Sequence, residues 1–572
     1  MQKTKRLRLA GVATMAALSL TLAACGGDAG NSNGAGASNV SPAPEGLDIE
    51  VNPEGDYNPL ERDQIQDGGE LTLALGELTQ QQNAFHANMT SDTRAVWNWY
   101  NPVLANFDGA GNYSPNEAYV LSAEESVEDD KTVVTYKLNP EAKFNDGTPI
   151  DIEAFKNTWE MNNGSNAAVT PNSTDGYELI ETVEAGADNF EVIVKFSTAY
   201  PWWQGLFNNV LHPEINTPEK FDNEYLNNLK PEYGAGPFKV ESVDFNAGTV
   251  VFTRNDNWWG DEAKLDKVTY RQMESQATIN AFEAGEIDAA GVGNRENLEV
   301  AASMGDAIDV RAALQPSNAL FTLNSDAPAL ADIKVREAIF NGIDRSQLAQ
   351  IRYNGMGYSE ELPGSLILFS TQEDYEDNLA DLISYDPEKS KSILEEAGYT
   401  LNDAEYYEKD GEQLSIRYVV VGDDEVSKSI ALATQKMLKD IGIEMTIDNK
   451  PSSEFSDITS ERDFDMFFSG FASSDPFGVA YFGQIYNSDS DLNMSGTGTP
   501  ELDEKIKELQ QLPTAEEQIE RSNELEKEAF AQYGLLPWAN GPSYVAVKKG
   551  LANMGAAGFA VLPKENIGWA KE

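Results

Sequence analysis

The sequence contains a single cysteine and only two histidines among its 572 residues. One thiol cannot form an internal disulfide, and so few soft ligands argue against zinc, iron–sulfur and nickel sites built from side chains. The two imidazoles, His86 and His212, are the only ones that a Ser-His-Asp triad could use, and neither lies in a catalytic motif. We therefore expect no metal, no cofactor and no such triad.

Basic residues are also scarce. The chain has 41 Lys and Arg against 95 Asp and Glu, a formal charge of −54. A surface of that sign repels phosphate backbones, which argues against nucleic acid as a partner. Hydrophobic residues make up 41% and aromatic residues 10% of the chain, which is enough for a large packed core. The length leaves room for about three to four domain-sized units.

Motifs for phosphate binding and nucleophilic catalysis are missing. The Gly-x-Gly pairs lack the third glycine of a dinucleotide fingerprint, no Gly-Lys dipeptide occurs, and no G-x-S-x-G elbow is present. Carboxylates are so numerous that neighbouring pairs arise by chance, so no acid is assigned a proton-transfer role. A surface hydrolase that uses paired carboxylates stays open as an alternative.

The N-terminus carries a targeting pattern. Four basic residues precede an apolar run at 9–22 (LAGVATMAALSLTL), which is shorter than the roughly 20 residues of a membrane span and suits a secretory signal. The run ends in LAACG, which resembles a bacterial lipoprotein signal with Cys25 as the acylated residue. That resemblance implies a protein held by acyl chains at the extracytoplasmic face of the bacterial cell membrane. Residues 26–65 are rich in Gly, Ser, Asn and Pro, which predicts a flexible stalk.

Strand and helix signals begin near residue 68. Residues 70–75 and 132–138 alternate like half-buried strands, and Asp151 is placed to cap a helix that carries Ile152, Phe155 and Trp159 on one face. No internal repeat is found.

The C-terminal half has the pattern of an α/β fold. A strand at 414–421, a helix at 425–440 and a strand at 443–447 follow one another with short connections, which predicts a right-handed parallel crossover. Asp386 and Pro387 mark the start of another helix, which we expect to end at Gly398. Further amphipathic helices are predicted at 335–342 and 500–510.

Four segments together resemble the extracytoplasmic solute-binding proteins of ABC importers, in the oligopeptide/dipeptide-binding class (family 5). They cover about 134–160 (VTYKLNPEAKFNDGTPIDIEAFKNTWE), 233–290 (from YGAGPFKVE to GEIDAA), 320–345 (LFTLNSDAPALADIKVREAIFNGIDR) and 385–399 (YDPEKSKSILEEAGY). The resemblance implies a type II, two-lobed clamp like other periplasmic binding proteins. The implied divisions are a signal peptide at 1–25, a stalk at 26–65, lobe one at 66–320 plus 540–572 with an extra subdomain at about 91–232, and lobe two at 321–539.

The family's mode of action implies that a ligand binds between the lobes and favours their closed state, which a membrane permease recognises. No covalent step is needed, so we expect a monomeric binding protein and not an enzyme. Peptide-binding members hold the ligand as an added strand. An oligosaccharide or another polar solute in the same clamp is the alternative ligand, and a sensor or adhesin is the alternative use.

The resemblance also suggests where the ligand lies. In peptide-binding members an aspartate four residues before a proline pairs with the ligand's α-amino group, but counting back from Pro476 gives Ala472, which puts recognition of a free peptide N-terminus in doubt. Because two adjacent indoles cannot both face one core, one of the tryptophans at 202 and 203 is a candidate ligand platform. The expected ligand-binding residues are Thr79, Gln80, Gln81, Gln82, Asn83, Trp202, Trp203, Phe471, Ser473, Ser474, Asp475 and Phe477.

Overall fold

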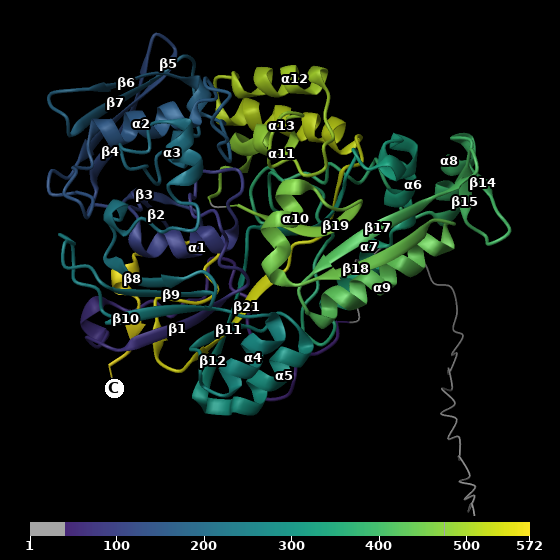
Figure 1. The fold of residues 1–572 in the computed structure, drawn as a ribbon, viewed down its shortest axis with the longest axis horizontal. Helices are drawn as coiled ribbons and strands as arrows, with labels where there is room; N and C mark the ends of the chain where they lie inside the picture. Colours follow the sequence, from purple (N-terminus) through teal and green to yellow (C-terminus); the bar gives the residue numbers. More distant parts are fainter. Residues whose placement is uncertain (1–39, 48, 474, 572) are drawn as a thin grey trace, which may run out of the picture. The chain divides into compact units, whose positions relative to one another are not determined.

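The computed structural model describes residues 40–47, 49–473 and 475–571. The predicted signal peptide at 1–25, the acylation of Cys25, the first part of the stalk at 26–39 and a ligand contact at Ser474 lie outside these residues. Within the described part of the chain, no helix has the length and apolar character needed to cross a bilayer. The fold is α/β and two-lobed, as predicted (Figure 1).

Lobe one is defined here by three sheets. The first, in the order β1-β10-β9-β8, pairs β1 with β10 in parallel and is otherwise antiparallel. Its strands are β1 (Glu70–Leu75), β10 (Lys267–Gln272), β9 (Thr249–Arg254) and β8 (Phe238–Asp244). The second, antiparallel sheet consists of β11 (Ala289–Gly291), β21 (Pro542–Lys548) and β12 (Ile308–Leu314).

The third sheet of lobe one belongs to the extra subdomain, which lies between β1 and β8 in the sequence. It has the order β4-β5-β7-β6 and is antiparallel throughout. The strands are β4 (Val120–Glu128), β5 (Lys131–Leu138), β7 (Glu191–Phe196) and β6 (Ile180–Ala185). Helix α2 (Ile152–Asn162) packs against this sheet, and the side chain of its predicted cap, Asp151, accepts the N–H of Glu153. Ile152 and Phe155 are buried in the underlying core.

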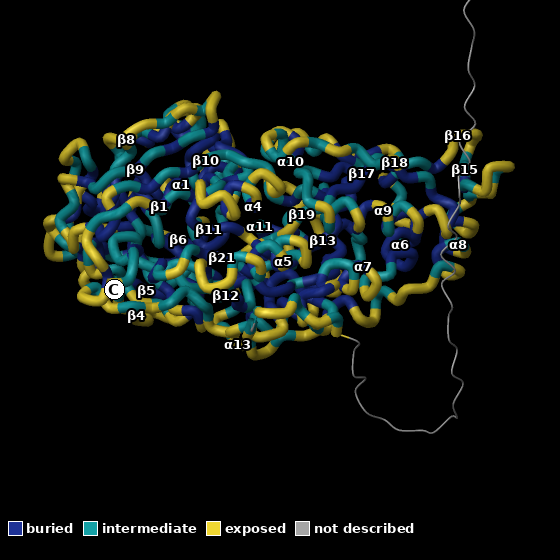
Figure 2. Tube along the Cα trace, turned by 90° about the horizontal axis from the view of Figure 1, so that it is seen from below, coloured by how far each residue is buried: buried dark blue, intermediate teal, exposed yellow. Residues whose placement is uncertain are grey.

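Lobe two is built on a mixed five-stranded sheet in the order β18-β17-β19-β13-β20. Its strands are β18 (Glu444–Lys450), β17 (Ser415–Val421), β19 (Met466–Ala472), β13 (Ser317–Leu323) and β20 (Leu535–Ala539). The predicted crossover is confirmed, because β17 and β18 pair in parallel and are connected by α9 (Glu425–Asp440). The strands at the centre of this sheet form much of the buried interior (Figure 2).

Two chain segments connect the lobes. β12 of lobe one continues into β13 of lobe two, and β20 of lobe two returns into β21 of lobe one. Each connection is only a few residues long, between 314 and 317 and between 539 and 542. Such short, paired connections allow the lobes to rotate about a hinge while each keeps its own sheet.

The remaining helices cover the sheets, and their ends follow ordinary capping chemistry. Asp386 accepts the N–H of Lys389 ahead of α8, Pro387 is its first residue, and Gly398 has a positive φ just beyond it, as predicted. The helices not yet named are α1 (Ser91–Tyr100), α3 (Pro218–Asn223), α4 (Ser275–Glu283), α5 (Arg295–Met304), α6 (Ile333–Gly342), α7 (Arg345–Arg352), α8 (Pro387–Glu396), α10 (Phe455–Glu461), α11 (Phe482–Tyr486), α12 (Pro500–Gln510) and α13 (Ala515–Phe530). The short strands are β2 (Ala105–Phe107), β3 (Tyr113–Pro115), β14 (Thr400–Leu401), β15 (Tyr407–Lys409), β16 (Glu412–Gln413), β22 (Leu551–Ala552) and β23 (Gly568–Trp569).

The described part of the predicted stalk differs from the expectation, because it packs on the body. Asn52 forms a bridge with β12, and Ile65 is fully buried. Leu47, Ile49 and Val51 pack against the core, although the surrounding composition is that of a linker. A flexible stalk therefore does not extend to residue 65.

Candidate functional site

The central strand β19 has an edge that is left open at its carboxyl end. β13 pairs with β19 along its whole length, whereas β17 pairs only with Met466 and Phe467. Beyond these residues, no described segment is paired with that edge. Gly470 and Ala472 are exposed there, although they belong to an interior strand of the sheet. An open strand edge of this kind is a template for a further extended chain.

Hydrogen bonds show which main-chain groups face the open edge. The N–H of Ser473 donates to the carbonyl of Pro316, so odd-numbered residues of β19 turn their main-chain groups toward β13. At the other end of the strand, Asn324 donates to Asp465, another odd-numbered residue. The two exposed residues are even-numbered, and their N–H and C=O groups therefore point away from β13, toward the open edge.

The loop that follows β19 closes against lobe one. Asp475 is 2% exposed and accepts the N–H of Phe477 at 2.9 Å and the hydroxyl of Tyr481 at 2.5 Å. Burial, and then the charge of Asp475, raises the pKa of Tyr481 well above its ordinary value. The ring of Phe477 lies 6.1 Å from Phe107 and 6.1 Å from Trp202, both in lobe one. The loop thus forms one wall where the lobes meet.

Arg94 comes to the same place from lobe one. It lies on α1, whose cap Thr90 accepts the N–H of Thr93 and whose other face is buried. Burial lowers the pKa of Arg94, and Tyr481 and Asp475 are the acidic groups close enough to oppose that effect. The residue as a whole is half-buried, and its guanidinium makes no hydrogen bond or ion pair with any described residue. A cation with unused donors therefore borders the loop after β19.

Two sets of hydrogen bonds join the lobes around this place. In the first, the Glu77 seam, Glu77 accepts the hydroxyl and N–H of Ser456 at 2.6 and 3.2 Å. Glu274 accepts the hydroxyl and N–H of Ser452 at 2.7 and 2.9 Å in the same way. Burial raises the pKa of Glu77.

The second set, the Asp175 seam, joins the extra subdomain to the helices of lobe two. Asp175 accepts the N–H of Gln484 at 2.7 Å and the side-chain amide of Gln510 at 2.5 Å. The indole N–H of Trp202 donates to Gln518 at 2.7 Å. Burial raises the pKa of Asp175 to about 7, because no cation compensates its charge.

The predicted polar segment after β1 mostly hydrogen-bonds within lobe one. The amide of Gln81 donates to Asp222, that of Gln82 to Thr79 and that of Asn83 to Phe221, while the hydroxyl of Thr79 donates to the carbonyl of Gln81. Four of the five residues are buried and only Gln80 is exposed. Buried amides must find partners, so these residues shape the loop, and a ligand contact from them stays a prediction.

The two indoles are both buried and turn in different directions. Trp202 is 9% exposed and bonds to lobe two, whereas Trp203 is 6% exposed and donates to Glu125 at 2.9 Å. Both rings belong to the same buried core, so the expectation that two adjacent indoles cannot share one core is wrong, and a ligand contact from either stays a prediction. Neither indole N–H is left for a ligand in this structure.

Other predicted residues lie together at the end of β19. Phe471 is half-buried, Ser473 donates its hydroxyl to the carbonyl of Asp475, and Phe477 packs as described above. Arg94, Gly470 and the residues of the two seams, apart from Trp202, were not predicted. A single basic residue in a helix, or a glycine in a strand, gives no sequence signal of a ligand contact. The exposed position of Gly470 follows from the order of the strands in the sheet.

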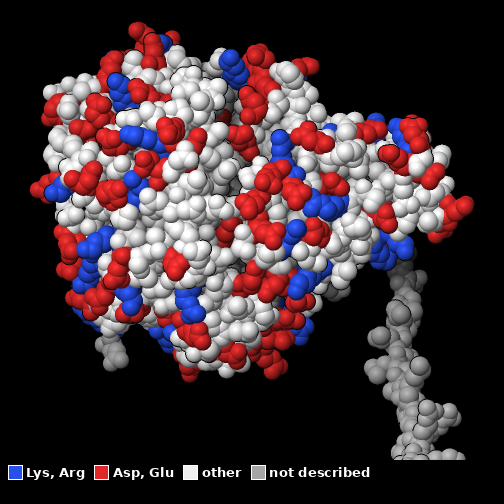
Figure 3. All heavy atoms as spheres, viewed as in Figure 1, with Lys and Arg blue, Asp and Glu red and all other residues white. Residues whose placement is uncertain are grey.

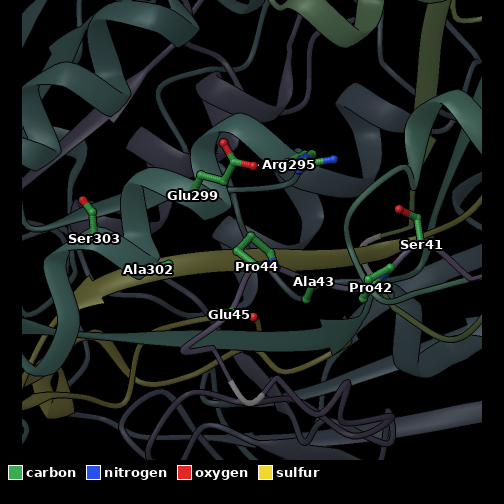
Figure 4. Close-up of a pocket in the computed structure, with 9 residues that line it drawn as sticks. All are labelled: Ser41, Pro42, Ala43, Pro44, Glu45, Arg295, Glu299, Ala302 and Ser303. Carbon is green, nitrogen blue, oxygen red and sulfur yellow. Dashed lines mark hydrogen bonds and ion pairs between the residues drawn. The ribbon is translucent and has the colours of Figure 1, made fainter. Parts of the chain in front are cut away.

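A further surface cavity lies elsewhere. It measures about 600 Å³ and is formed by residues 41–45 and α5 (Figure 4). Its one cation, Arg295, is paired with Glu299 at 2.8 Å, and the lining also contains the exposed carboxylate of Glu45. Among the described residues, no group of three His, Cys, Asp or Glu side chains is placed to hold a metal ion.

Comparisons with known proteins agree with this architecture. The chain is 33% identical over 526 residues to the oligopeptide-binding protein OppA of Mycobacterium tuberculosis, covering 90% of this chain and 87% of the relative. The solved structure of a periplasmic EDTA-binding protein, EppA, superposes with a TM-score of 0.77 at 24% identity, over 90% of this chain and 98% of the other. The oligopeptide-binding protein AppA of Bacillus subtilis, in complex with a nonapeptide, superposes with a TM-score of 0.74 at 20% identity, over 89% and 100%.

A family profile decides the classification. Residues 117–493 match the profile described as "Bacterial extracellular solute-binding proteins, family 5 Middle". Members of this family are extracytoplasmic binding components of ABC importers and not enzymes. The resemblance inferred from the four sequence segments is thereby confirmed. The chain belongs to family 5 of the bacterial extracellular solute-binding proteins.

Proposed function

We propose that this protein captures peptides between its lobes and delivers them to an ABC permease, while acyl chains on Cys25 hold it at the membrane. The observation that carries the peptide assignment is the open edge of β19. The main-chain N–H and C=O groups of Gly470 and Ala472 offer a peptide the same bonds that a neighbouring strand would offer. The name of the mycobacterial relative supports the same ligand class.

The two seams supply the mechanism of capture. A ligand shifts an equilibrium between open and closed lobes only through its higher affinity for the closed form. A peptide that pairs with β19 and also contacts lobe one makes its full set of contacts only when the lobes are closed. The Glu77 and Asp175 seams form in the same state. Release then requires the permease to separate the lobes, with the ligand unchanged.

Peptide binding is tested by calorimetry on the protein without its first 39 residues, using tetraalanine as the probe. The variant Ala472→Pro removes one N–H from the open edge and leaves the pairing with β13 intact, because Ala472 faces away from β13. We expect a three- to tenfold loss of affinity, about the effect of one hydrogen bond. Ala472→Ser keeps the N–H and is the matched control. Equal affinities in both variants, or no binding of peptides to the unaltered protein, would refute the assignment.

A polar solute other than a peptide is the second candidate. It is favoured by the alanine at position 472, where peptide-binding members carry the aspartate that pairs with the ligand's amino group. The likeness in fold to a protein named as EDTA-binding supports a ligand of this kind. Mass spectrometry of small molecules released from natively purified protein separates the two candidates. A released oligosaccharide or chelate, in place of peptides, would decide for the second.

The lipid anchor has its own test. Cells expressing the full chain are fed an alkyne analogue of palmitate, and the protein is examined for incorporation. We expect labelling of the unaltered chain and none of Cys25→Ser, which should appear in the medium. Membrane retention of the unlabelled variant would contradict the anchor.

A further inference from the structure

Resting on the proposed function, in which the lobes close around a ligand, we propose that the segment before β1 is a strap that crosses the hinge and stabilises the closed lobes. The strap is defined here as residues 40–47 and 49–65. Its later part is bound to lobe one and its first residues contact lobe two, so it forms a third connection beside the two hinge segments. Unlike those segments, it is held at lobe two by non-covalent contacts and can be released there.

The attachment to lobe one is made by main-chain hydrogen bonds next to the hinge. The N–H of Asn52 donates to the carbonyl of Ala312 at 2.9 Å, and its carbonyl accepts the N–H of Leu314 at 3.0 Å. Asp56 accepts the N–H of Ala312 at 3.1 Å and forms a bridge with Ala556. Leu314 is the last residue of β12, after which the chain crosses to lobe two. The strap is thus fixed to lobe one directly beside the first hinge connection.

The attachment to lobe two lies in the loop after α7, a helix that contacts β20 and α9 of that lobe. The carbonyl of Ser41 accepts the N–H of Gly357 at 2.9 Å. A Cβ at Gly357 would lie 3.4 Å from that of Ala43, which is ordinary van der Waals contact. Because the two attachments lie on different lobes, a rotation of the lobes changes the distance that the strap has to span.

The loop that receives the strap is itself fastened to the hinge. Glu360 accepts the N–H of Asn540 at 2.7 Å and the N–H of Gly541 at 2.9 Å. Both of these residues belong to the second connection between the lobes. The same carboxylate accepts the hydroxyl of Tyr353, at the start of the loop. The contact at Gly357 therefore acts on a loop that holds the hinge in place.

The first residues of the strap are stiff but loosely packed. The prolines at 42 and 44 fix φ at about −65° and favour extended backbone at the residues before them, so this stretch loses little entropy when it docks. Residues 41–45 line the cavity of about 600 Å³ beside α5 (Figure 4) and do not fill it. Their hold on lobe two therefore depends on the contact with Gly357.

The charge of the surface favours an uncharged connection at this place. Acidic side chains outnumber basic ones over the face in Figure 3, in keeping with the net charge of −54. Like charges on the two lobes repel one another and oppose closure. Residues 40–44 (VSPAP) carry no charged side chain, so they contact lobe two without adding to this repulsion.

The first experiment compares two chains, one that begins at residue 40 and one that begins at residue 44. Residues 40–572 form one compact unit, and both chains keep the apolar residues of the strap that pack on the core. Only the longer chain contains Ser41, the partner of Gly357. Small-angle scattering without ligand should show that the shorter chain is more open. The ratio of closed to open molecules should fall by about three- to tenfold, the effect of one hydrogen bond.

A cross-link tests the same contact in the opposite direction. The chain that begins at residue 40 lacks Cys25, the only cysteine, so Ala43→Cys combined with Gly357→Cys creates a single possible disulfide. The Cβ separation of 3.4 Å is close to that of natural disulfides. Oxidation should hold the ligand-free protein in the closed form, and reduction should reverse this. Gly357→Cys alone is the matched control, because it has the same backbone strain, at a φ of 69°, without the cross-link.

Both measurements are made without ligand, so they do not depend on the ligand class. Equal closed fractions in the two chain lengths would overturn the inference. A disulfide that does not form, or that leaves the closed fraction unchanged, would overturn it as well. If peptides fail to bind while the scattering results are as expected, peptide capture is refuted and the strap stands.

Discussion

The two seams that join the lobes differ in how they hold their carboxylates. In the Glu77 seam, each acid accepts a hydroxyl and an N–H from one serine, and Glu274 retains access to solvent. In the Asp175 seam, the acid is 4% exposed and takes its donors from a helix N–H and an amide. Similar polar contacts therefore respond differently to pH, because burial without a compensating cation favours the protonated acid.

The largest expected effect is a pH dependence of closure through Asp175. Its pKa is raised from 3.8 to about 7 in the closed state, so the closed state binds more protons within that range. Closure is therefore favoured as pH falls below 7 and disfavoured as pH rises toward 7, with an upper limit of about 4 kcal/mol. Small-angle scattering of the ligand-free protein between pH 5 and 8 measures the closed fraction.

Asp175→Asn should flatten this pH profile, whereas Glu274→Gln in the other seam should leave it unchanged. Glu178 and Tyr200 are the titratable groups that act on Asp175 most directly. Burial raises the pKa of Glu178, and Lys507 opposes that rise. If the pH dependence of closure persists in Asp175→Asn, it would be assigned to Glu178, and the proposed role of Asp175 would be wrong.

The next effect is steric and also confined to the Asp175 seam. A Cβ at Gly483, on α11, would lie 2.5 Å from a carboxylate oxygen of Asp175. Gly483→Ala should thus favour the open state by about 1–3 kcal/mol, although alanine is the better helix former. Gly293→Ala, where a Cβ meets nothing within 4 Å, is the control. Scattering curves that are identical for the two variants would show that the seam is not required for closure.

A smaller effect is expected from Trp202→Phe. The change keeps an aromatic ring beside Phe477 and removes the hydrogen bond to Gln518. The closed state should lose about 1 kcal/mol, and peptide affinity should fall by about fivefold through the coupled equilibrium. Retained affinity would show that this indole contributes packing only.

The smallest effect is expected in the Glu77 seam. Ser452→Ala removes a hydroxyl from Glu274, which can bind water instead, so closure should weaken by about 0.5 kcal/mol. Ser456→Ala should cost somewhat more, because Glu77 is 8% exposed. A loss larger than that of Gly483→Ala would reverse the ranking of the two seams.

Much of the architecture could be predicted from local patterns. The strand at 70–75, the helix at 425–440 and the caps at Asp151 and Asp386 coincide with elements of the structure, because spacing and capping chemistry act over a few residues. The same patterns failed for residues 49–65. There the apolar residues that anchor the segment are few, and only contacts with distant strands reveal them.

The candidate site was less accessible to prediction. The glutamines after β1 have the right chemistry for a polar ligand, but their amides bond to neighbouring segments of lobe one. Whether a side-chain amide is free to bind a ligand or is hydrogen-bonded within the protein depends on segments that are far away in the sequence. Arg94 carried no local signal, since its unusual feature is the absence of a partner among the described residues.

The acidic composition, the missing catalytic motifs and the four family segments are enough to assign this chain to the solute-binding proteins. Where a ligand can bind depends on how the chain packs in three dimensions. The open edge of β19 exists because β17 stops pairing at Phe467, and the loop after β19 contacts lobe one through Phe477. Local interactions select helices and strands, whereas unused hydrogen-bond donors are a property of the packed chain as a whole.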